Sequence, residues 1–249
     1  MAPALSGKVA VVTGGGTGIG RASALLLAQE GANVVVNYSR SEKEASETAA
    51  EIEKLGVKAK AVRADVSQRE QAEELIAAAE RAFGRVDVLV NSAGRTRFIP
   101  YPQLDDLTDQ VWDEIMQLNL MGAFYTSRAA ARRMLAQGDG SIVNIASIAG
   151  LGTNASSIPY AVSKGALLTL TKTMARALAP KVRVNAIAPG VVETRWVGDN
   201  EEFKAQGRAA TPLGRNAQAE DVARAVRYFA VDATFVTGQV HIVDGGRVI

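Results

Sequence analysis

The chain has 249 residues, of which 47% are hydrophobic and 22% charged, proportions that are typical of a globular protein. A net charge of +2, with no cluster of Lys and Arg interleaved with aromatics, argues against nucleic-acid binding. The absence of cysteine and the single histidine, His241, exclude disulfides, thiolate zinc sites, cysteine nucleophiles and His-dependent triads. We interpret His241, which lies in an alternating run, as a strand residue, and we expect no metal site.

The N-terminal residues and the hydropathy pattern predict the cellular location of the protein. Residues 1–7 lack a basic segment followed by an apolar one, so no secretion signal is predicted. No uncharged apolar run approaches the length of a membrane span. We therefore expect a cytoplasmic protein that does not associate with membranes.

Apolar runs and helical periodicity alternate along the first part of the chain. Strands are predicted at 8–13, 33–37, 58–64 and 86–90, and helices at 21–29, 41–55 and 71–83. Strands that are almost wholly apolar and alternate with helices are typical of a parallel sheet covered on both faces.

The same alternation continues in the second part. Helices are predicted at 107–136, 160–179 and 219–231, and strands at 141–145, 182–187 and 236–243. Because no linker interrupts the pattern, we predict an α/β fold, with residues 1–249 forming a single doubly wound Rossmann domain of about seven parallel strands with helices on both faces. The least regular segment, 190–214, leaves the carboxyl end of a strand, where we expect a substrate loop.

A glycine-rich turn lies between the first predicted strand and helix. Its residues are Thr13, Gly14, Gly15, Gly16, Thr17, Gly18, Ile19 and Gly20. Glycines allow a tight turn and a close approach of backbone N–H groups to a pyrophosphate, and the helix N-terminus adds a positive dipole. In this position the turn indicates a dinucleotide-binding site.

The end of the second strand bears on which dinucleotide binds. An acid here would bond the ribose 2′-hydroxyl of NAD, but the sequence runs Asn37, Tyr38, Ser39, Arg40. Ser39 can donate to a 2′-phosphate and Arg40 can pair with one, which favours NADP(H) over NAD(H). The alternative is a solvated arginine at a helix start.

Polar residues also follow the next two strands. Asp65 and Val66 follow the third strand, and Asn91, Ala93 and Gly94 follow the fourth. We expect these residues to border the adenine and the nearer ribose, although each polar residue alone is also explained as a turn residue or a helix cap.

Tyr160 and Lys164 are four residues apart, directly after Pro159. With Pro159 in the first turn of a helix, both side chains lie on one face. Taken alone, the pair is also explained as a core tyrosine beside a lysine that extends to water. Ser147 follows the strand at 141–145 and precedes Tyr160 by thirteen residues.

These motifs, in their order and spacing, resemble those of the short-chain dehydrogenase/reductase family over nearly the whole chain. The matching residues are Thr13, Gly14, Gly18, Gly20, Asp65, Asn91, Ala93, Gly94, Asn119, Ser147, Tyr160, Lys164, Pro189, Gly190 and Thr194. The resemblance implies that Thr194 binds the nicotinamide carboxamide and that Pro189, Gly190 and Val192 lie beside the same ring.

The resemblance also implies the catalytic roles. Tyr160 would exchange a proton with the substrate oxygen, which Ser147 would hold by a hydrogen bond. Lys164 would lower the pKa of Tyr160 and bond the nicotinamide ribose. Asn119 would hold a water that connects Lys164 to solvent; a helix kink or a satisfied core amide is the alternative.

Two departures from the family pattern are visible. Ser92 stands where the family usually has an asparagine, a change that we expect to be tolerated. Thr17 stands where many NADP(H)-preferring members carry a basic residue, so Arg40 and its polar neighbours would carry that preference.

The function that we expect is an NADP(H)-dependent interconversion of a ketone and a secondary alcohol, similar to that of 3-oxoacyl or carbonyl reductases. An NAD(H)-dependent sugar, polyol or hydroxysteroid dehydrogenase is the alternative within enzymes, and a non-catalytic dinucleotide-binding protein the alternative outside them. We expect a small-molecule substrate and a homotetramer. Residues 95–109, which include Phe98 and Tyr101, would line the pocket or a subunit contact.

Overall fold

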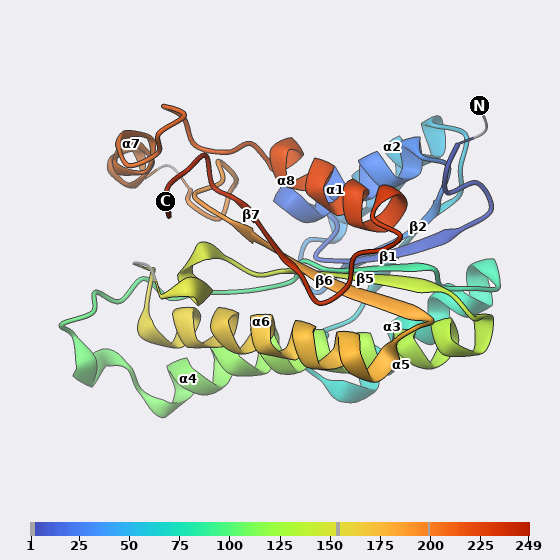
Figure 1. The fold of residues 1–249 in the computed structure, drawn as a ribbon, viewed down its shortest axis with the longest axis horizontal. Helices are drawn as coiled ribbons and strands as arrows, with labels where there is room; N and C mark the ends of the chain where they lie inside the picture. The colour runs from blue at the N-terminus through green and yellow to red at the C-terminus, as the bar shows by residue number, and fades with distance from the viewer. Residues whose placement is uncertain (1–2, 153–154, 199) are drawn as a thin grey trace.

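A seven-stranded parallel sheet lies between two layers of helices in the computed structural model, which describes residues 3–152, 155–198 and 200–249 (Figure 1). The strand order is β3-β2-β1-β4-β5-β6-β7. The strands are β1 Val9–Thr13, β2 Asn33–Tyr38, β3 Ala59–Arg63, β4 Val88–Asn91, β5 Gly140–Ile145, β6 Val182–Pro189 and β7 Val240–Val243. The order reverses between β1 and β4, which confirms the predicted doubly wound sheet.

The helices cover both faces of the sheet, as predicted (Figure 1). On one face lie α1 Gly18–Gln29, α2 Glu42–Lys54 and α8 Ala219–Arg227. On the other lie α3 Arg69–Phe83, α4 Asp109–Met116, α5 Ala123–Gln137 and α6 Ile158–Leu178. A further helix, α7 Glu201–Ala209, lies apart from these layers, near the C-terminus.

The central strands are buried on both faces, which explains their continuous apolar runs. Along β1, Ala10 and Val12 pack into the core on the α1 side, while Val11 packs into the core on the α3 side. All three residues have no exposed surface. Alternation of successive side chains thus divides the apolar residues between two cores and fixes the orientation of each strand.

Three segments differ from the sequence prediction. The loop predicted over 190–214 contains α7, whose sequence EEFKAQGRA lacks the apolar repeat that would indicate a helix; Asp199 lies outside the described residues. The helix predicted over 107–136 begins at Asp109 and passes through a π-helical segment, Gln117–Gly122. The last strand is β7 alone, because the preceding residues depart from an extended conformation: Val236 N donates to Ala233 O in a turn, and Gly238 has a positive φ of 72°.

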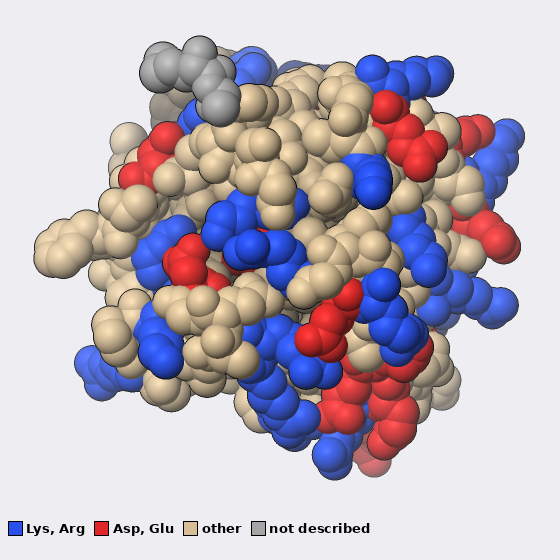
Figure 2. Space-filling view, turned by 90° about the vertical axis from the view of Figure 1, so that its right-hand side faces the viewer, with Lys and Arg blue, Asp and Glu red and all other residues tan. Residues whose placement is uncertain are grey.

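The surface carries charges of both signs in close proximity. Figure 2 shows basic and acidic side chains intermixed on the face it presents. Ion pairs such as Arg21 with Glu51 and Arg227 with Glu30 join side chains that are distant in sequence. Within the described ranges, no helix has both the length and the apolar character that crossing a membrane requires.

Candidate active site

The carboxyl ends of the central strands open onto one cavity of about 980 Å³. Parallel strands end at the same edge of a sheet, so residues that follow β1, β2, β4, β5 and β6 meet there. Most of the predicted cofactor residues line this cavity: Gly14, Gly16, Thr17, Gly18, Ile19, Asn37, Tyr38, Ser39, Arg40, Asp65, Val66, Ala93, Gly94, Tyr160, Lys164, Pro189, Gly190, Val192 and Thr194. Ser147 lines it as well.

The turn between β1 and α1 requires glycine at specific positions. Gly14 and Gly18 have positive φ angles of 62° and 51°. A Cβ on Gly20 would lie 2.3 Å from the carbonyl oxygen of Gly14, and one on Gly16 would lie 2.8 Å from the backbone nitrogen of Ala45. The turn therefore brings bare backbone to the cavity at the N-terminus of α1, an arrangement that fits a dinucleotide pyrophosphate.

Two of the predicted cofactor residues, Thr13 and Asn91, do not line the cavity but support the backbone that forms it. The buried Oγ1 of Thr13 accepts hydrogen bonds from the backbone nitrogens of Ser92 and Ala93, both at 3.0 Å. Asn91 Nδ2 donates to Asn144 Oδ1 at 2.8 Å. These buried side chains fix the ends of β1, β4 and β5, so their contribution to a bound dinucleotide is positional.

Asn37 has a similar structural role at the end of β2. Its Nδ2 lies within hydrogen-bond distance of three carbonyl oxygens, those of Tyr38, Val62 and Ala64, and its Oδ1 accepts from Gly14 N at 3.3 Å. A side chain so engaged is held away from a ribose. Ser39 and Arg40, by contrast, are exposed and line the cavity, as binding to a 2′-phosphate would require.

Asp65 and Val66 lie at the same end of the cavity, after β3. Asp65 Oδ1 accepts from the backbone nitrogen of Ser67 at 3.0 Å and from its hydroxyl at 2.6 Å. One carboxylate oxygen is thereby engaged in the turn that leads to α3.

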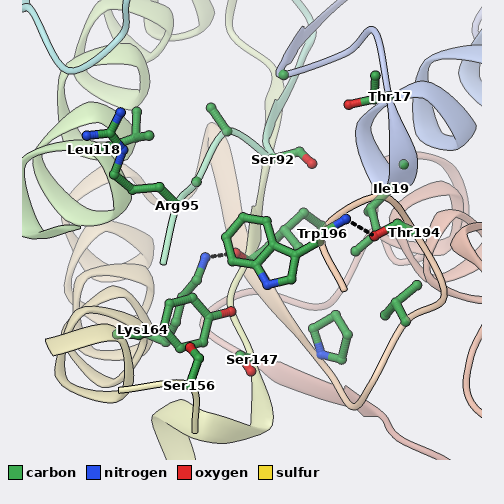
Figure 3. Close-up of a pocket in the computed structure, with 18 of the residues that line it drawn as sticks. Thr17, Ile19, Ser92, Arg95, Leu118, Ser147, Ser156, Lys164, Thr194 and Trp196 are labelled. Carbon is green, nitrogen blue, oxygen red and sulfur yellow. Dashed lines mark hydrogen bonds between the residues drawn. The ribbon is translucent and has the colours of Figure 1, made fainter. Parts of the chain in front are cut away.

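At the other end of the cavity, α6 presents Tyr160 and Lys164 together. Pro159 occupies the first turn of the helix, as predicted. Lys164 is only 5% exposed, and its Nζ donates to the carbonyl oxygen of Ile145 at 2.8 Å (Figure 3). The ammonium lies 5.8 Å from the centre of the Tyr160 ring. The lysine therefore does not extend to bulk water, which removes the alternative explanation of the pair.

Burial dominates the ionisation of this pair. It raises the pKa of Tyr160 to about 12, and the hydrogen bond with Ser147 opposes the rise. Burial lowers the pKa of Lys164 to about 8. The expectation that Lys164 assists the ionisation of Tyr160 during catalysis stays a prediction. At neutral pH the phenol keeps its proton, as a donor to a carbonyl oxygen must.

Asn119 lies in the π-helical segment, 1% exposed. Its Oδ1 accepts from Arg95 N at 2.8 Å, and its Nδ2 donates to Arg95 O at 3.0 Å and to Ser163 Oγ at 3.0 Å. The side-chain amide of Asn119 is therefore satisfied within the protein at an irregularity of the helix, and its role in holding a water stays a prediction. It ties the loop after β4 to α6, next to Lys164.

The substrate end contains three aromatic residues, of which sequence reasoning proposed Phe98 as a pocket residue but did not identify Trp196 and Phe203. Trp196, two residues after Thr194, packs against Tyr160 with ring centroids 5.9 Å apart (Figure 3). Phe203 of α7 lines the same cavity, as does Phe98 from the segment 95–109. The signal that the sequence offered for these aromatic residues was their position in irregular segments next to motif residues, since neither segment has a periodic pattern.

Comparisons with known proteins agree with this geometry. A family model described as "Enoyl-(Acyl carrier protein) reductase" matches residues 14–247. The chain is 47% identical to "Granaticin polyketide synthase putative ketoacyl reductase 2" of Streptomyces violaceoruber, over 96% of this chain and 95% of that one. It is 40% identical to a 3-oxoacyl-[acyl-carrier-protein] reductase of Synechocystis, over 99% of each.

Solved structures include a similar fold. The crystal structure of the NADPH-dependent 3-quinuclidinone reductase from Rhodotorula rubra matches with a TM-score of 0.91 at 30% identity. The match covers 99% of this chain and 93% of that one.

Proposed function

The chain belongs to the short-chain dehydrogenase/reductase family of oxidoreductases, and from this premise we propose that it reduces a ketone to a secondary alcohol with NADPH. One observation carries the proposal: Ser147, Tyr160 and the buried Lys164 line one cavity that also contains the glycine-rich dinucleotide turn. NADPH supplies the hydride when bound.

The chain's own residues supply the proton and the orientation. Ser147 donates a hydrogen bond to the carbonyl oxygen and fixes its position against Tyr160. Tyr160 then gives its proton to that oxygen as the carbonyl carbon accepts the hydride. The ammonium of Lys164 stabilises the phenolate that remains until a proton from solvent restores the phenol.

The preference for NADP(H) rests on the end of β2. Ser39 and Arg40 are exposed there, and the side chain of Asn37, in the place of a ribose-binding acid, is engaged with the backbone. The Rhodotorula reductase is named as NADPH-dependent, which supports the same choice. An NAD(H)-dependent dehydrogenase of sugars, polyols or hydroxysteroids is the competing function, and the ratio of initial rates with NADPH and NADH discriminates the two.

The names of the relatives support a 3-oxoacyl compound or a related ketone as substrate. The description of the family model instead names an enoyl reductase, which reduces a carbon–carbon double bond. Ser147 and Tyr160 form a pair that suits an oxygen atom, because one hydroxyl can hold it while the other protonates it. Parallel assays with a 3-oxoacyl thioester and the corresponding enoyl thioester separate the two reactions.

We also propose that the protein is a homotetramer. The edge strand β7 and its flanks expose large apolar side chains, with Phe235 and Ile249 fully exposed and Ile242 42% exposed. Apolar exposure of this kind marks a surface for association. Light scattering measures the mass directly, and a monomer would contradict the proposal. The cytoplasmic location stays a prediction.

The substitution Tyr160→Phe tests the catalytic assignment. Removing the phenol proton should lower kcat by about 10²- to 10⁴-fold, the usual contribution of a general acid, while NADPH still binds. NADPH oxidation and NADPH binding by calorimetry measure the two effects separately. Turnover equal to that of the wild type would contradict the mechanism.

A further inference from the structure

The substrate end of the cavity has an aromatic wall, which we define as Trp196, Phe98 and Phe203. The indole of Trp196 is tilted by 49° against the Tyr160 ring at 5.9 Å and is 41% exposed. Figure 3 shows it in the middle of the pocket. A group attached to a carbonyl at Tyr160 therefore meets this indole directly.

The other two members of the aromatic wall contact each other across the cavity mouth. Phe98 and Phe203 meet edge to face, with ring centroids 5.8 Å apart and planes at 81°. Phe98 is 55% exposed, and both rings line the same cavity as Tyr160. Exposed apolar rings that continue a catalytic cavity are typical of a surface that binds an apolar ligand.

The backbone that carries Phe98 is fixed on both sides. Asn119 holds Arg95 through two hydrogen bonds, and Ile99 N donates to Ser156 O at 2.8 Å. Thr96 and Ser156 also join their hydroxyls at 2.5 Å. Since Ser156 lies just before α6 and Asn119 donates to Ser163 of α6, Phe98 is positioned relative to the helix that carries Tyr160 and Lys164.

Phe203 is fixed in turn by the start of α7. The side chain of Asn200 accepts a hydrogen bond from Phe203 N at 2.9 Å. Backbone anchoring of this kind lowers the entropic cost of ordering a binding surface when ligand arrives.

Two arginines near the aromatic wall pair with the same carboxylate. Arg95 lines the cavity, but its Nη1 pairs with Glu114 Oε2 at 3.0 Å. The guanidinium of Arg97 pairs with the same carboxylate at 3.4 Å. Two arginines share one carboxylate, so this group keeps a net positive charge, and the choice of a ring at this end rests on the aromatic contacts.

We propose that the aromatic wall selects ketones whose carbonyl is attached to an aromatic or conjugated ring, with Trp196 as the principal specificity-determining residue. This inference rests on the proposed function and names the substrate class of the same site. A planar ring bonded to the carbonyl lies against the indole and the edge of the Phe98–Phe203 pair. Offset and edge-to-face contacts of this kind favour an aromatic ring over a saturated ring of the same size.

The test compares two β-keto esters that differ only in ring saturation, ethyl benzoylacetate and ethyl 3-cyclohexyl-3-oxopropanoate. The measured quantity is the aromatic-to-saturated ratio of kcat/KM, with NADPH as reductant. Trp196→Leu keeps an apolar side chain without the ring, and we expect it to lower the ratio by about tenfold. Trp196→Phe restores most of the ratio, and Trp112→Phe, a change on α4 outside the cavity lining, leaves the ratio as in the wild type.

The possible outcomes test the specificity role of Trp196 and the proposed function separately. A ratio that stays the same in Trp196→Leu, while both ketones are still reduced, overturns the specificity role and leaves the proposed function standing. If the ratio stays the same and light scattering shows an altered mass for Trp196→Leu, the specificity role is also overturned and the proposed function also stands. The aromatic wall would then be a subunit contact. No NADPH oxidation with either ketone in the wild type overturns the proposed function and this inference with it.

Discussion

The two ends of the cavity are built in different ways. At the dinucleotide end, glycines and bare backbone form the surface, and side chains such as Thr13 and Asn37 are engaged in holding strand ends together. At the ketone end, side chains form the surface: Ser147 from the segment after β5, Tyr160 and Lys164 from α6, and the aromatic wall from two loops and α7.

Because of this difference, the amino-acid sequence restricts the residue types at the two ends of the cavity to different degrees. A backbone surface needs residue types that few other positions accept, such as glycine at a positive φ or where a Cβ has no room. A side-chain surface accepts many residues, and the loops that bring them together decide its shape. The dinucleotide end is therefore common to many proteins, while the ketone end distinguishes this one.

The largest effect that we expect at the ketone end comes from Ser147→Ala. Loss of the hydroxyl that holds the substrate oxygen should lower kcat by about 10²- to 10³-fold. Steady-state NADPH oxidation measures it. The matched control is Ser141→Ala on the same strand, whose hydroxyl donates to Phe229 O, away from the cavity, and whose kcat should stay within about twofold. Equal losses in both variants would show that the effect is structural.

The buried lysine gives a prediction about stability and pH. In the folded protein Lys164 loses its proton near pH 8, whereas in the unfolded chain it keeps the proton up to about pH 10.5. Between these values the unfolded chain binds more protons, so the free energy of unfolding rises with pH, by roughly 2–3 kcal/mol relative to Lys164→Met.

Denaturant unfolding of the wild type and of Lys164→Met from pH 7 to 10 measures this difference. Comparison with the variant cancels the lysines that both proteins share. Lys172→Met, an exposed position on the same helix, is the control and should show no such rise. A difference between wild type and Lys164→Met that is constant with pH would contradict the assigned pKa.

At the dinucleotide end, Gly20→Ala tests whether the backbone turn is as tight as described. The new Cβ would lie 2.3 Å from Gly14 O, so the turn must shift. We expect a loss of about 1–3 kcal/mol in the free energy of unfolding and weaker NADPH binding. The neighbouring Arg21→Ala removes only an exposed ion pair with Glu51, which contributes about 0–1 kcal/mol. Unchanged NADPH affinity in Gly20→Ala would contradict the role of the turn.

The smallest effect concerns Arg40, one of the two side chains that we assign to cofactor choice. Arg40→Asp should lower the NADPH-to-NADH ratio of kcat/KM by about tenfold, because a carboxylate repels the 2′-phosphate that arginine attracts. Initial rates with both cofactors measure the ratio. Lys60→Asp, the same charge change at an exposed position on β3 outside the cavity lining, should leave the ratio unaltered. An unaltered ratio in Arg40→Asp would show that Arg40 does not determine the preference for NADPH.

Much of the fold followed from the sequence because apolar strands and glycine turns leave clear patterns. The apolar runs at 8–13 and 33–37 predict β1 and β2 to within one residue at each end. The helix α7 left no such pattern, because its buried contact is limited to Gly207. The π-helical segment 117–122 was hidden for another reason: it interrupts the hydrogen bonding of a helix without interrupting its apolar periodicity.

Some residues of the candidate site were likewise predictable from the sequence, and others were not. Tyr160, Lys164 and Ser147 were expected together from the resemblance to the family, and the structure brings all three to one cavity. The engagement of Asn37 and Asn91 with neighbouring strands was not predictable, since it depends on which strands are adjacent. The position of Trp196 against Tyr160 depends on the path of the loop after β6, which no local pattern specifies.

The central claim is that this site delivers a hydride to a carbonyl carbon and a proton from Tyr160 to its oxygen. The most direct measurement reduces ethyl benzoylacetate with NADPH that carries deuterium at the transferred position and locates the label by mass spectrometry. The account predicts one deuterium on the carbinol carbon with the wild type and almost no product with Tyr160→Phe. Product that lacks the label at that carbon, or equal product from both proteins, would contradict it.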